Sequence, residues 1–209
     1  MRFLPFTCAL ILLALAASAA DRTPRGEPGK FDSYLLALSW SPAYCESRPG
    51  DAQCAPGRKF AFVVHGLWPQ YNNGRWPEFC STAPGLKNPD AMLDLMPSRS
   101  LIRHEWEKHG TCSGLSADGY FALIRKTYQS VRIPQRFTNP AKWMVISPAE
   151  VKREFVAANP KLRDSMVSVQ CSSNMLSEVR ICLGRDGTPI PCTGQRDCRA
   201  AQVRMPPVR

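Results

Sequence analysis

The sequence of 209 residues has no apolar run that reaches the roughly 20 residues needed to cross a membrane. Its apolar run over residues 8–17 is too short for an anchor and lies inside residues 1–20, which carry one early Arg and end in Ser18-Ala19-Ala20. These features predict a secretory signal peptide that is cleaved before Asp21. We therefore expect a protein secreted to a periplasm or to the extracellular space, without membrane contact.

The sequence also lacks any C-x-x-C pair, which argues against a zinc ribbon or a thioredoxin-type site. Of its nine cysteines, Cys8 falls in the predicted signal peptide and eight remain. An even number of cysteines in an exported chain predicts disulfide bonds, although spacing alone leaves their pairing open.

Acidic residues are scarce, because 17 Asp and Glu stand against 27 Lys and Arg, for a formal net charge of +10. An exported protein this basic tends to meet a polyanion such as nucleic acid, anionic lipid or acidic polysaccharide. Solubility alone would also explain such a charge, so the charge by itself names no partner.

Four stretches have the length and the apolar, β-branched composition of strands. The stretch that begins at residue 59 is expected to end as a strand at Val64, because Gly66 interrupts the pattern just after His65. The turn formers between residues 69 and 97 predict a long loop region, and such loops are often functional. The predicted strands span residues 31–40, 59–64, 165–171 and 176–183.

After the long loop region, apolar residues recur with the period of a helix. Ser100 is the expected cap of a helix that stops at Gly110. Ser147-Pro148-Ala149-Glu150 has the pattern of a capping box with Pro at the first helical position. The predicted helices span residues 101–109, 116–132 and 148–158.

This mixed order of elements predicts one α+β domain over residues 31–198. Residues 21–30 are rich in Pro and Gly and are expected to form a flexible leader. Residues 199–209 are expected to be a basic tail without regular structure. Nothing in the sequence marks an oligomer interface, so we expect a monomer.

The chain has only three histidines, and two of them lie in "HEWEKHGTC", residues 104–112. On a helix with about 100° per residue, His104, Glu105, Lys108 and His109 project into one sector of roughly 140°. Trp106 points away from that sector and is expected in the core. Gathering two imidazoles, a carboxylate and an ammonium on one side predicts a polar pocket.

This cluster does not have the spacing of a metal site. The zinc motif H-E-x-x-H places its histidines at i and i+4, whereas His104 and His109 are five residues apart. Lys108 would also repel a cation. We expect no metal and no cofactor.

The cluster favours acid–base chemistry instead, because the ordinary histidine pKa of about 6.5 allows both proton uptake and release. The third histidine, His65, lies in the polar and aromatic segment "VVHGLWPQ". Cleavage of RNA by its own 2′-hydroxyl needs a base, an acid and a cation near the phosphate. DNA lacks this hydroxyl and would not be cleaved.

The segments "HGLWP" (65–69) and "HEWEKHGTC" (104–112) resemble the two active-site segments of the ribonuclease T2 family. The similarity extends to "FDSYLLALSWSPAYC" (31–45). The resemblance implies an α+β domain with a central antiparallel sheet, several helices and stabilising disulfides. It also implies metal-independent endonucleolytic cleavage of single-stranded RNA, through 2′,3′-cyclic phosphates to 3′-phosphate ends.

The resemblance also implies a role for each residue of the cluster. His109 would be the general base that deprotonates the 2′-hydroxyl, and His65 the general acid for the leaving oxygen. His104 would help hold the phosphate. Glu105 and Lys108 would stabilise the pentacoordinate phosphorus.

By the same resemblance, Trp68 would help form the main base pocket. Gln70 stands where some family members carry an Asp that reads adenine, so we expect low base specificity. Tyr71 and Trp76 are candidate stacking residues, although packing within the loop would explain them equally well. Trp40 is expected in the core.

The disulfides implied by the resemblance are Cys80–Cys112, Cys171–Cys198, Cys182–Cys192 and Cys45–Cys54. Two other functions stay open beside the ribonuclease. One is a catalytically silent RNA- or polyanion-binding protein on the same fold. The other, a metal hydrolase, is disfavoured by the histidine spacing.

Overall fold

The computed structural model describes residues 23–208, and the predicted signal peptide lies outside them. Within these residues six strands form one sheet in the order β2-β1-β5-β6-β3, and β4 pairs with β5. Every pairing is antiparallel except the short parallel contact between β5 and β6. The strands are β1 (Ser33–Trp40), β2 (Phe62–Gln70), β3 (Met144–Ile146), β4 (Val167–Ser172), β5 (Met175–Leu183) and β6 (Val203–Met205).

Four α-helices occur in the described part of the chain: α1 (Ser41–Ser47), α2 (Arg99–Lys108), α3 (Ala117–Gln129) and α4 (Pro148–Ala158). The last three correspond to the three predicted helices. Ser98, rather than the expected Ser100, caps α2 by accepting a hydrogen bond from the Leu101 N–H. Ser147 caps α4 as predicted, through the Glu150 N–H.

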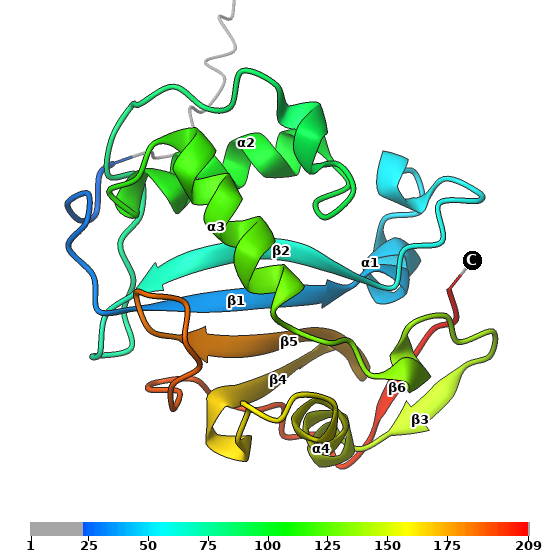
Figure 1. The fold of residues 1–209 in the computed structure, drawn as a ribbon. Coiled ribbons are helices and arrows are strands. Elements are labelled where there is room, and N and C mark those ends of the chain that lie inside the picture. Colours follow the sequence, from blue (N-terminus) through cyan, green and yellow to red (C-terminus); the bar gives the residue numbers. More distant parts are fainter. Residues whose placement is uncertain (1–22, 209) are drawn as a thin grey trace, which may run out of the picture.

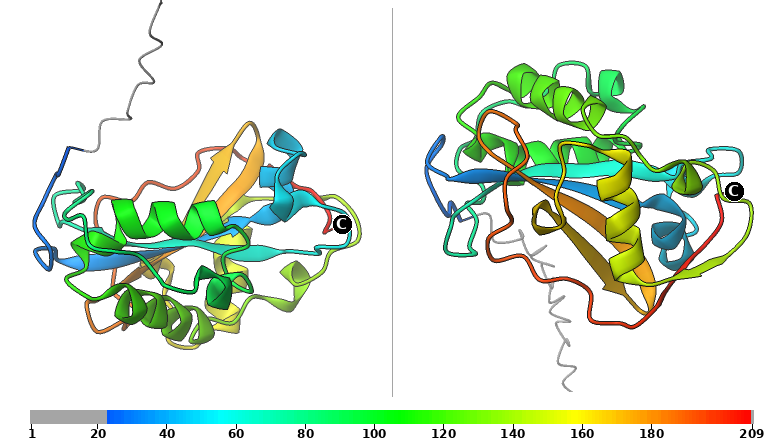
Figure 2. Two further views of the ribbon diagram at one scale, coloured as in Figure 1. Left: turned by 90° about the horizontal axis from the view of Figure 1, so that it is seen from above. Right: turned by 60° about the horizontal axis from the view of Figure 1, so that its bottom comes forward.

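The two faces of the sheet differ in chemistry. Alternate residues of β1 and β5, such as Leu36, Leu38 and Val179, are fully buried in the hydrophobic core. The other face carries Ser39 and Glu178, which are opposite each other in the β1–β5 register. Helices α2 and α3 lie along the β2 side of the sheet, and α4 packs against β4 (Figures 1 and 2).

Strand β2 does not end at Val64, as the sequence pattern predicts, but continues to Gln70. Gly66 pairs with Ala37 and Val64 with Leu38, so His65 is the extra residue of a β-bulge. A bulge lets the ladder continue past the irregular residue while turning its side chain to a new direction. The glycine therefore interrupts the side-chain pattern without ending the strand.

The expectation of an unstructured C-terminal tail is wrong for β6, which pairs with β3 and β5. Val203 and Met205 are buried, whereas Arg204 is exposed with its guanidinium over the Trp143 ring. This alternation is the signature of a strand, and the basic composition of the segment conceals it.

The segment expected to be a flexible leader also makes backbone contacts. Arg25 forms a β-bridge with Glu78, and the Gly29 N–H donates to the Cys112 carbonyl. Residues 23–30 are thereby held against the loop and the helix end that contribute to the site described below.

All four disulfides implied by the family resemblance are present: Cys45–Cys54, Cys80–Cys112, Cys171–Cys198 and Cys182–Cys192. Cys80–Cys112 joins the long loop to the turn that follows α2. Within residues 23–208, no helix is both long enough and apolar enough to span a bilayer.

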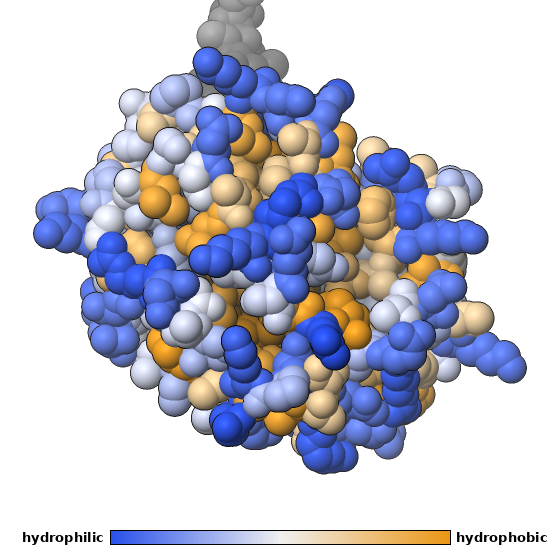
Figure 3. Space-filling view, in the orientation of Figure 1, coloured by the Kyte–Doolittle hydropathy of each residue, from blue (hydrophilic) through white to orange (hydrophobic). Residues whose placement is uncertain are grey.

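Hydrophilic side chains cover much of the face seen in Figure 3, with hydrophobic residues scattered between them. In the described part of the chain, the large hydrophobic side chains that are exposed are Trp76, Leu115, Trp143 and Val145.

Candidate active site

A cavity of about 440 Å³ opens on the polar face of the sheet. Its walls come from β2, from α2, from β5 and from the loop that follows β5, so segments far apart in the sequence meet there. The lining residues most relevant to chemistry are His65, Trp68, Gln70, Trp76, His104, Glu105, Lys108, His109, Gln170, Arg180, Gln195 and Arg196.

Helix α2 delivers its polar sector to this cavity, as the helical count predicts. His104, Glu105, Lys108 and His109 all line it. Trp106 is buried on another side of the helix, where its indole N–H donates to the Ala83 carbonyl at 2.8 Å. The amphipathic pattern of α2 therefore separates a polar side that lines the cavity from a packing side.

His65 lies between two carboxylates. Its Nδ1 is 2.6 Å from Glu178 Oε1, and its Nε2 is 3.7 Å from Glu105 Oε1. Burial alone lowers the His65 pKa, but the hydrogen bond to Glu178 and the charges of both carboxylates outweigh this effect and raise the pKa above 6.5. Both carboxylates therefore favour the proton-bearing form of His65.

Glu105 is a buried carboxyl group, 1% exposed, that accepts a hydrogen bond from Trp68 Nε1 at 2.6 Å. Burial raises its pKa to about 7, although His65, Trp68 and Lys108 act in the opposite direction. Gly66 makes this contact possible, because a Cβ atom there would lie 2.0 Å from Glu105 Oε2. The bulged strand and the helix can approach this closely only because residue 66 has no side chain.

Glu105 should lower the stability of the fold at alkaline pH. Its folded pKa of about 7 exceeds the ordinary value of 4.5, so the associated stability is present below pH 4.5 and is lost as pH rises through 7. Above that range the loss is on the order of 3 kcal/mol. We expect Glu105→Gln to match the wild type in thermal unfolding at pH 4 and to melt at a higher temperature at pH 8.

Glu154→Gln is a suitable control, because Glu154 is a partly exposed carboxylate paired with Arg136 outside the cavity. Its melting temperature should follow the wild type at both pH values. A difference between Glu105→Gln and wild type that did not change with pH would contradict the prediction.

His109 has the opposite environment to His65. It is 6% exposed, its ring centre is 5.4 Å from that of Trp68, and its Nδ1 is buried without a hydrogen-bond partner in the described structure. Burial, together with the positive charges of Lys108, His104 and His65, lowers the His109 pKa well below 6.5. The neutral imidazole is therefore favoured.

Lys108 reaches the cavity from the end of α2 and forms an ion pair with Glu78 at 3.2 Å. Glu78 also accepts a hydrogen bond from Trp76 Nε1 at 2.8 Å and pairs with Arg25 at 2.7 Å. This network connects the long loop, the N-terminal segment and α2 at the rim of the site.

Of the predicted base-contacting residues, Trp68, Gln70 and Trp76 line the cavity. The Gln70 amide N–H donates to the Pro69 carbonyl at 2.9 Å. Tyr71 does not join them, because it packs against the hydrophobic core. The structure thus places Trp76, which is 50% exposed, on the cavity wall and Tyr71 against the core.

Glu178 and Arg180 of β5 were not among the site residues predicted from the sequence. Their signal is present in the sequence, since two charges at i and i+2 in "LSEVRICL" share one face of an otherwise apolar strand. The Arg180 side chain holds Glu178 Oε2 through two contacts of 2.7 and 2.8 Å and lies over the Trp68 ring.

Comparisons with known proteins agree with this geometry. A ribonuclease of Aeromonas hydrophila is 36% identical over 90% of this chain and 88% of its own length. The structure of an RNase-related protein from Calystegia sepium has a TM-score of 0.70 and 25% identity over 84% of this chain and 97% of its own. A variant of RNase MC1, solved in complex with 5′-GMP, has a TM-score of 0.66 and 26% identity over 83% and 99% of the two chains.

The fold is α+β, histidines line its cavity, and ribonucleases are among its relatives. The protein is therefore a ribonuclease. The family follows from the model that matches residues 31–192: the chain belongs to the Ribonuclease T2 family.

Proposed function

We propose that this ribonuclease cleaves single-stranded RNA by metal-independent transesterification with low base specificity. The observation that carries the proposal is the pair of opposite histidine environments in one cavity. The Trp68 ring lies 5.1 Å from His65, which has two carboxylate neighbours, and 5.4 Å from His109, which has cationic neighbours. Groups whose surroundings separate their pKa values in this way suit the roles of acid and base.

In the first step, neutral His109 removes the proton from the 2′-hydroxyl. The 2′-oxygen forms a bond to phosphorus while the bond from phosphorus to the 5′-oxygen breaks. Protonated His65 transfers its proton to that leaving oxygen, and the product strand ends in a 2′,3′-cyclic phosphate. Water then opens the ring to a 3′-phosphate with the two histidines in exchanged roles.

The remaining residues of the cluster hold and neutralise the phosphate. Lys108 and His104 lie on the cavity wall beside Glu105, so a phosphate there would meet positive charge and hydrogen-bond donors as negative charge develops. Trp68 and Trp76 offer ring faces on which any base can stack. Four disulfides are typical of an oxidising compartment, which supports secretion of the mature protein, expected to be a monomer.

The test is to incubate the oxidised protein with single-stranded RNA and with DNA of matching sequence, both in excess EDTA, and to identify the ends by mass spectrometry. We expect RNA fragments with 2′,3′-cyclic phosphate ends and intact DNA. RNA binding without cleavage would favour the catalytically silent alternative, and loss of cleavage in EDTA would favour a metal hydrolase.

A further inference from the structure

Glu178 is a buried carboxylate to which the proposed mechanism assigns no step. It is 8% exposed and sits on β5, opposite Ser39 of β1. It is not among the residues that line the cavity, whereas its neighbours His65 and Arg180 are. Glu178 is therefore placed to act through these neighbours.

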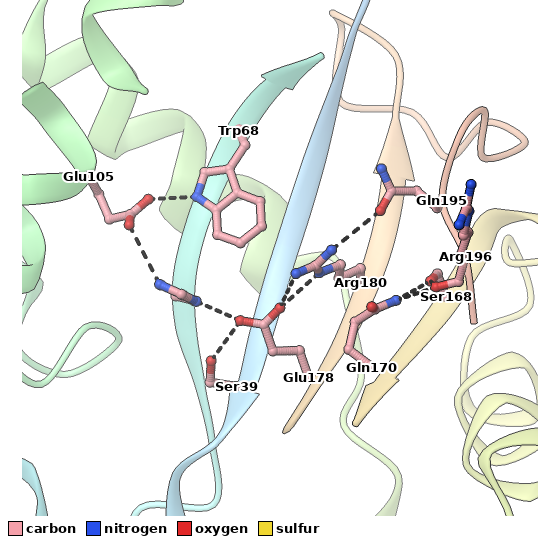
Figure 4. A network of polar contacts seen from close by, with 10 residues as sticks. Ser39, Trp68, Glu105, Ser168, Gln170, Glu178, Arg180, Gln195 and Arg196 are labelled. Atoms are coloured by element: carbon pink, nitrogen blue, oxygen red, sulfur yellow. Dashed lines mark hydrogen bonds and ion pairs between the residues drawn. The ribbon is translucent and has the colours of Figure 1, made fainter. Parts of the chain in front are cut away.

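Both oxygens of Glu178 are occupied (Figure 4). Oε1 contacts His65 Nδ1 at 2.6 Å and accepts a hydrogen bond from Ser39 Oγ at 3.3 Å. Oε2 accepts from Arg180 Nε at 2.8 Å and pairs with Arg180 Nη2 at 2.7 Å. The carboxylate is thus fixed from three sides by groups on β1, β2 and β5.

This arrangement determines which nitrogen of His65 faces the reaction. An ionised carboxylate can only accept a hydrogen bond, so His65 Nδ1 must carry a proton and donate it to Glu178. The other nitrogen, Nε2, lies on the side of Glu105, a residue of the cavity wall. A proton on Nε2 is then the one that can be transferred to substrate.

We infer that Glu178 is a positioning residue, which fixes the His65 ring with Nε2 toward the cavity and favours the doubly protonated imidazole that donates a proton to the leaving 5′-oxygen. This inference rests on the proposed function. It adds a second carboxylate to the site, separate in role from Glu105, which lies against Trp68 on the cavity wall.

Arg180 completes the arrangement. Burial alone raises the Glu178 pKa, but the hydrogen bond and charge of His65 and the charge of Arg180 lower it to about 2. The charged groups that act on the His65 pKa are Glu178 and Arg180 from β5 and Glu105 from α2. The cationic residues of α2 and its C-cap that line the same cavity are Lys108 and, when protonated, His104 and His109.

The decisive experiment compares Glu178→Gln with the wild type on two substrates. The first is the dinucleotide UpU, whose alkoxide leaving group needs an acid. The second is uridine 3′-(4-nitrophenyl phosphate), whose leaving group departs without one. We expect Glu178→Gln to lower kcat for UpU at pH 7 by about 10-fold or more, within the range of a general-acid contribution, and to change kcat for the aryl ester by less than threefold.

The pH profile provides the second readout. Loss of a neighbouring negative charge lowers a histidine pKa. The alkaline limb of kcat/KM for UpU, where the acid loses its proton, should therefore move to lower pH in Glu178→Gln. Glu178→Asp keeps the charge and should keep the alkaline limb near its wild-type position. Glu154→Gln, outside the cavity, should leave kcat for both substrates and the pH profile of kcat/KM unchanged.

The outcomes separate this inference from the proposed function. If the wild type cleaves neither substrate, the proposed function fails. If the wild type cleaves both, while Glu178→Gln loses both activities equally or keeps its alkaline limb, the inference about Glu178 is overturned. Equal loss would mean that Glu178 only supports the fold, which the melting temperatures of Glu178→Gln and Glu178→Asp would confirm independently.

Discussion

Replacing His109 with Ala is expected to lower kcat/KM for single-stranded RNA by about 10²–10⁴-fold, the usual contribution of a group that transfers a proton. Its neighbours His65 and Glu105 are not expected to replace it. Two carboxylates favour the proton-bearing form of His65, and Glu105 accepts a hydrogen bond from the Trp68 N–H. The measurement is the initial rate of RNA cleavage over a range of concentrations, with purified and oxidised protein.

The fold must be checked in the same samples, because the His109 side chain is buried at the C-cap of α2. Far-UV circular dichroism and the count of free thiols should match the wild type. Lys161→Ala removes an exposed cation that is not part of the cavity and should retain full activity. If His109→Ala kept more than a tenth of wild-type activity, the assignment of the base would be wrong.

Gly66→Ala should have the second largest effect, although it adds only one methyl group. The new Cβ would meet Glu105 Oε2 at 2.0 Å and Trp68 Nε1 at 2.3 Å, and would separate the two groups that now bond at 2.6 Å. Overpacking of this kind destabilises by about 1–3 kcal/mol. Displacement of site groups by about 1 Å can reduce activity by roughly 10²-fold.

Gly50→Ala is the matched control, since a Cβ at Gly50 would meet nothing within 4 Å. It should leave both the melting temperature and kcat/KM near the wild-type values. The prediction for Gly66 is checked by the same two measurements, and Gly66→Ala with wild-type activity would show that the Trp68–Glu105 contact is dispensable.

The parts of the site that lie close together in sequence could be predicted. The polar sector of α2 follows from the helical repeat, and the burial of Trp106 on another side follows from the same count. Trp40 is buried as predicted. These predictions succeeded because the geometry of a helix or a strand is local, so residue spacing converts directly into direction.

The partners of His65 could not be predicted in the same way. Glu178 is 113 residues away in sequence and reaches His65 only because β1 lies between β2 and β5. The bulge that turns His65 toward it depends on the pairing of Gly66 with Ala37. Strand order and register are properties of the whole sheet, and no short segment of the sequence carries them.

The place of β6 in the sheet has a consequence for the route by which the chain folds. β3 joins the sheet through β6 alone, and Met144 and Met205 become neighbours only after the long intervening chain has closed. Closing such a loop has an entropic cost that must be met before the contact contributes, and nonlocal pairing of this kind is slow. β1 and β2 pair across a shorter connection, residues 41–61, so the two ends of one sheet should assemble at different times. Pulsed hydrogen exchange should therefore protect the β1–β2 amides before those of β3.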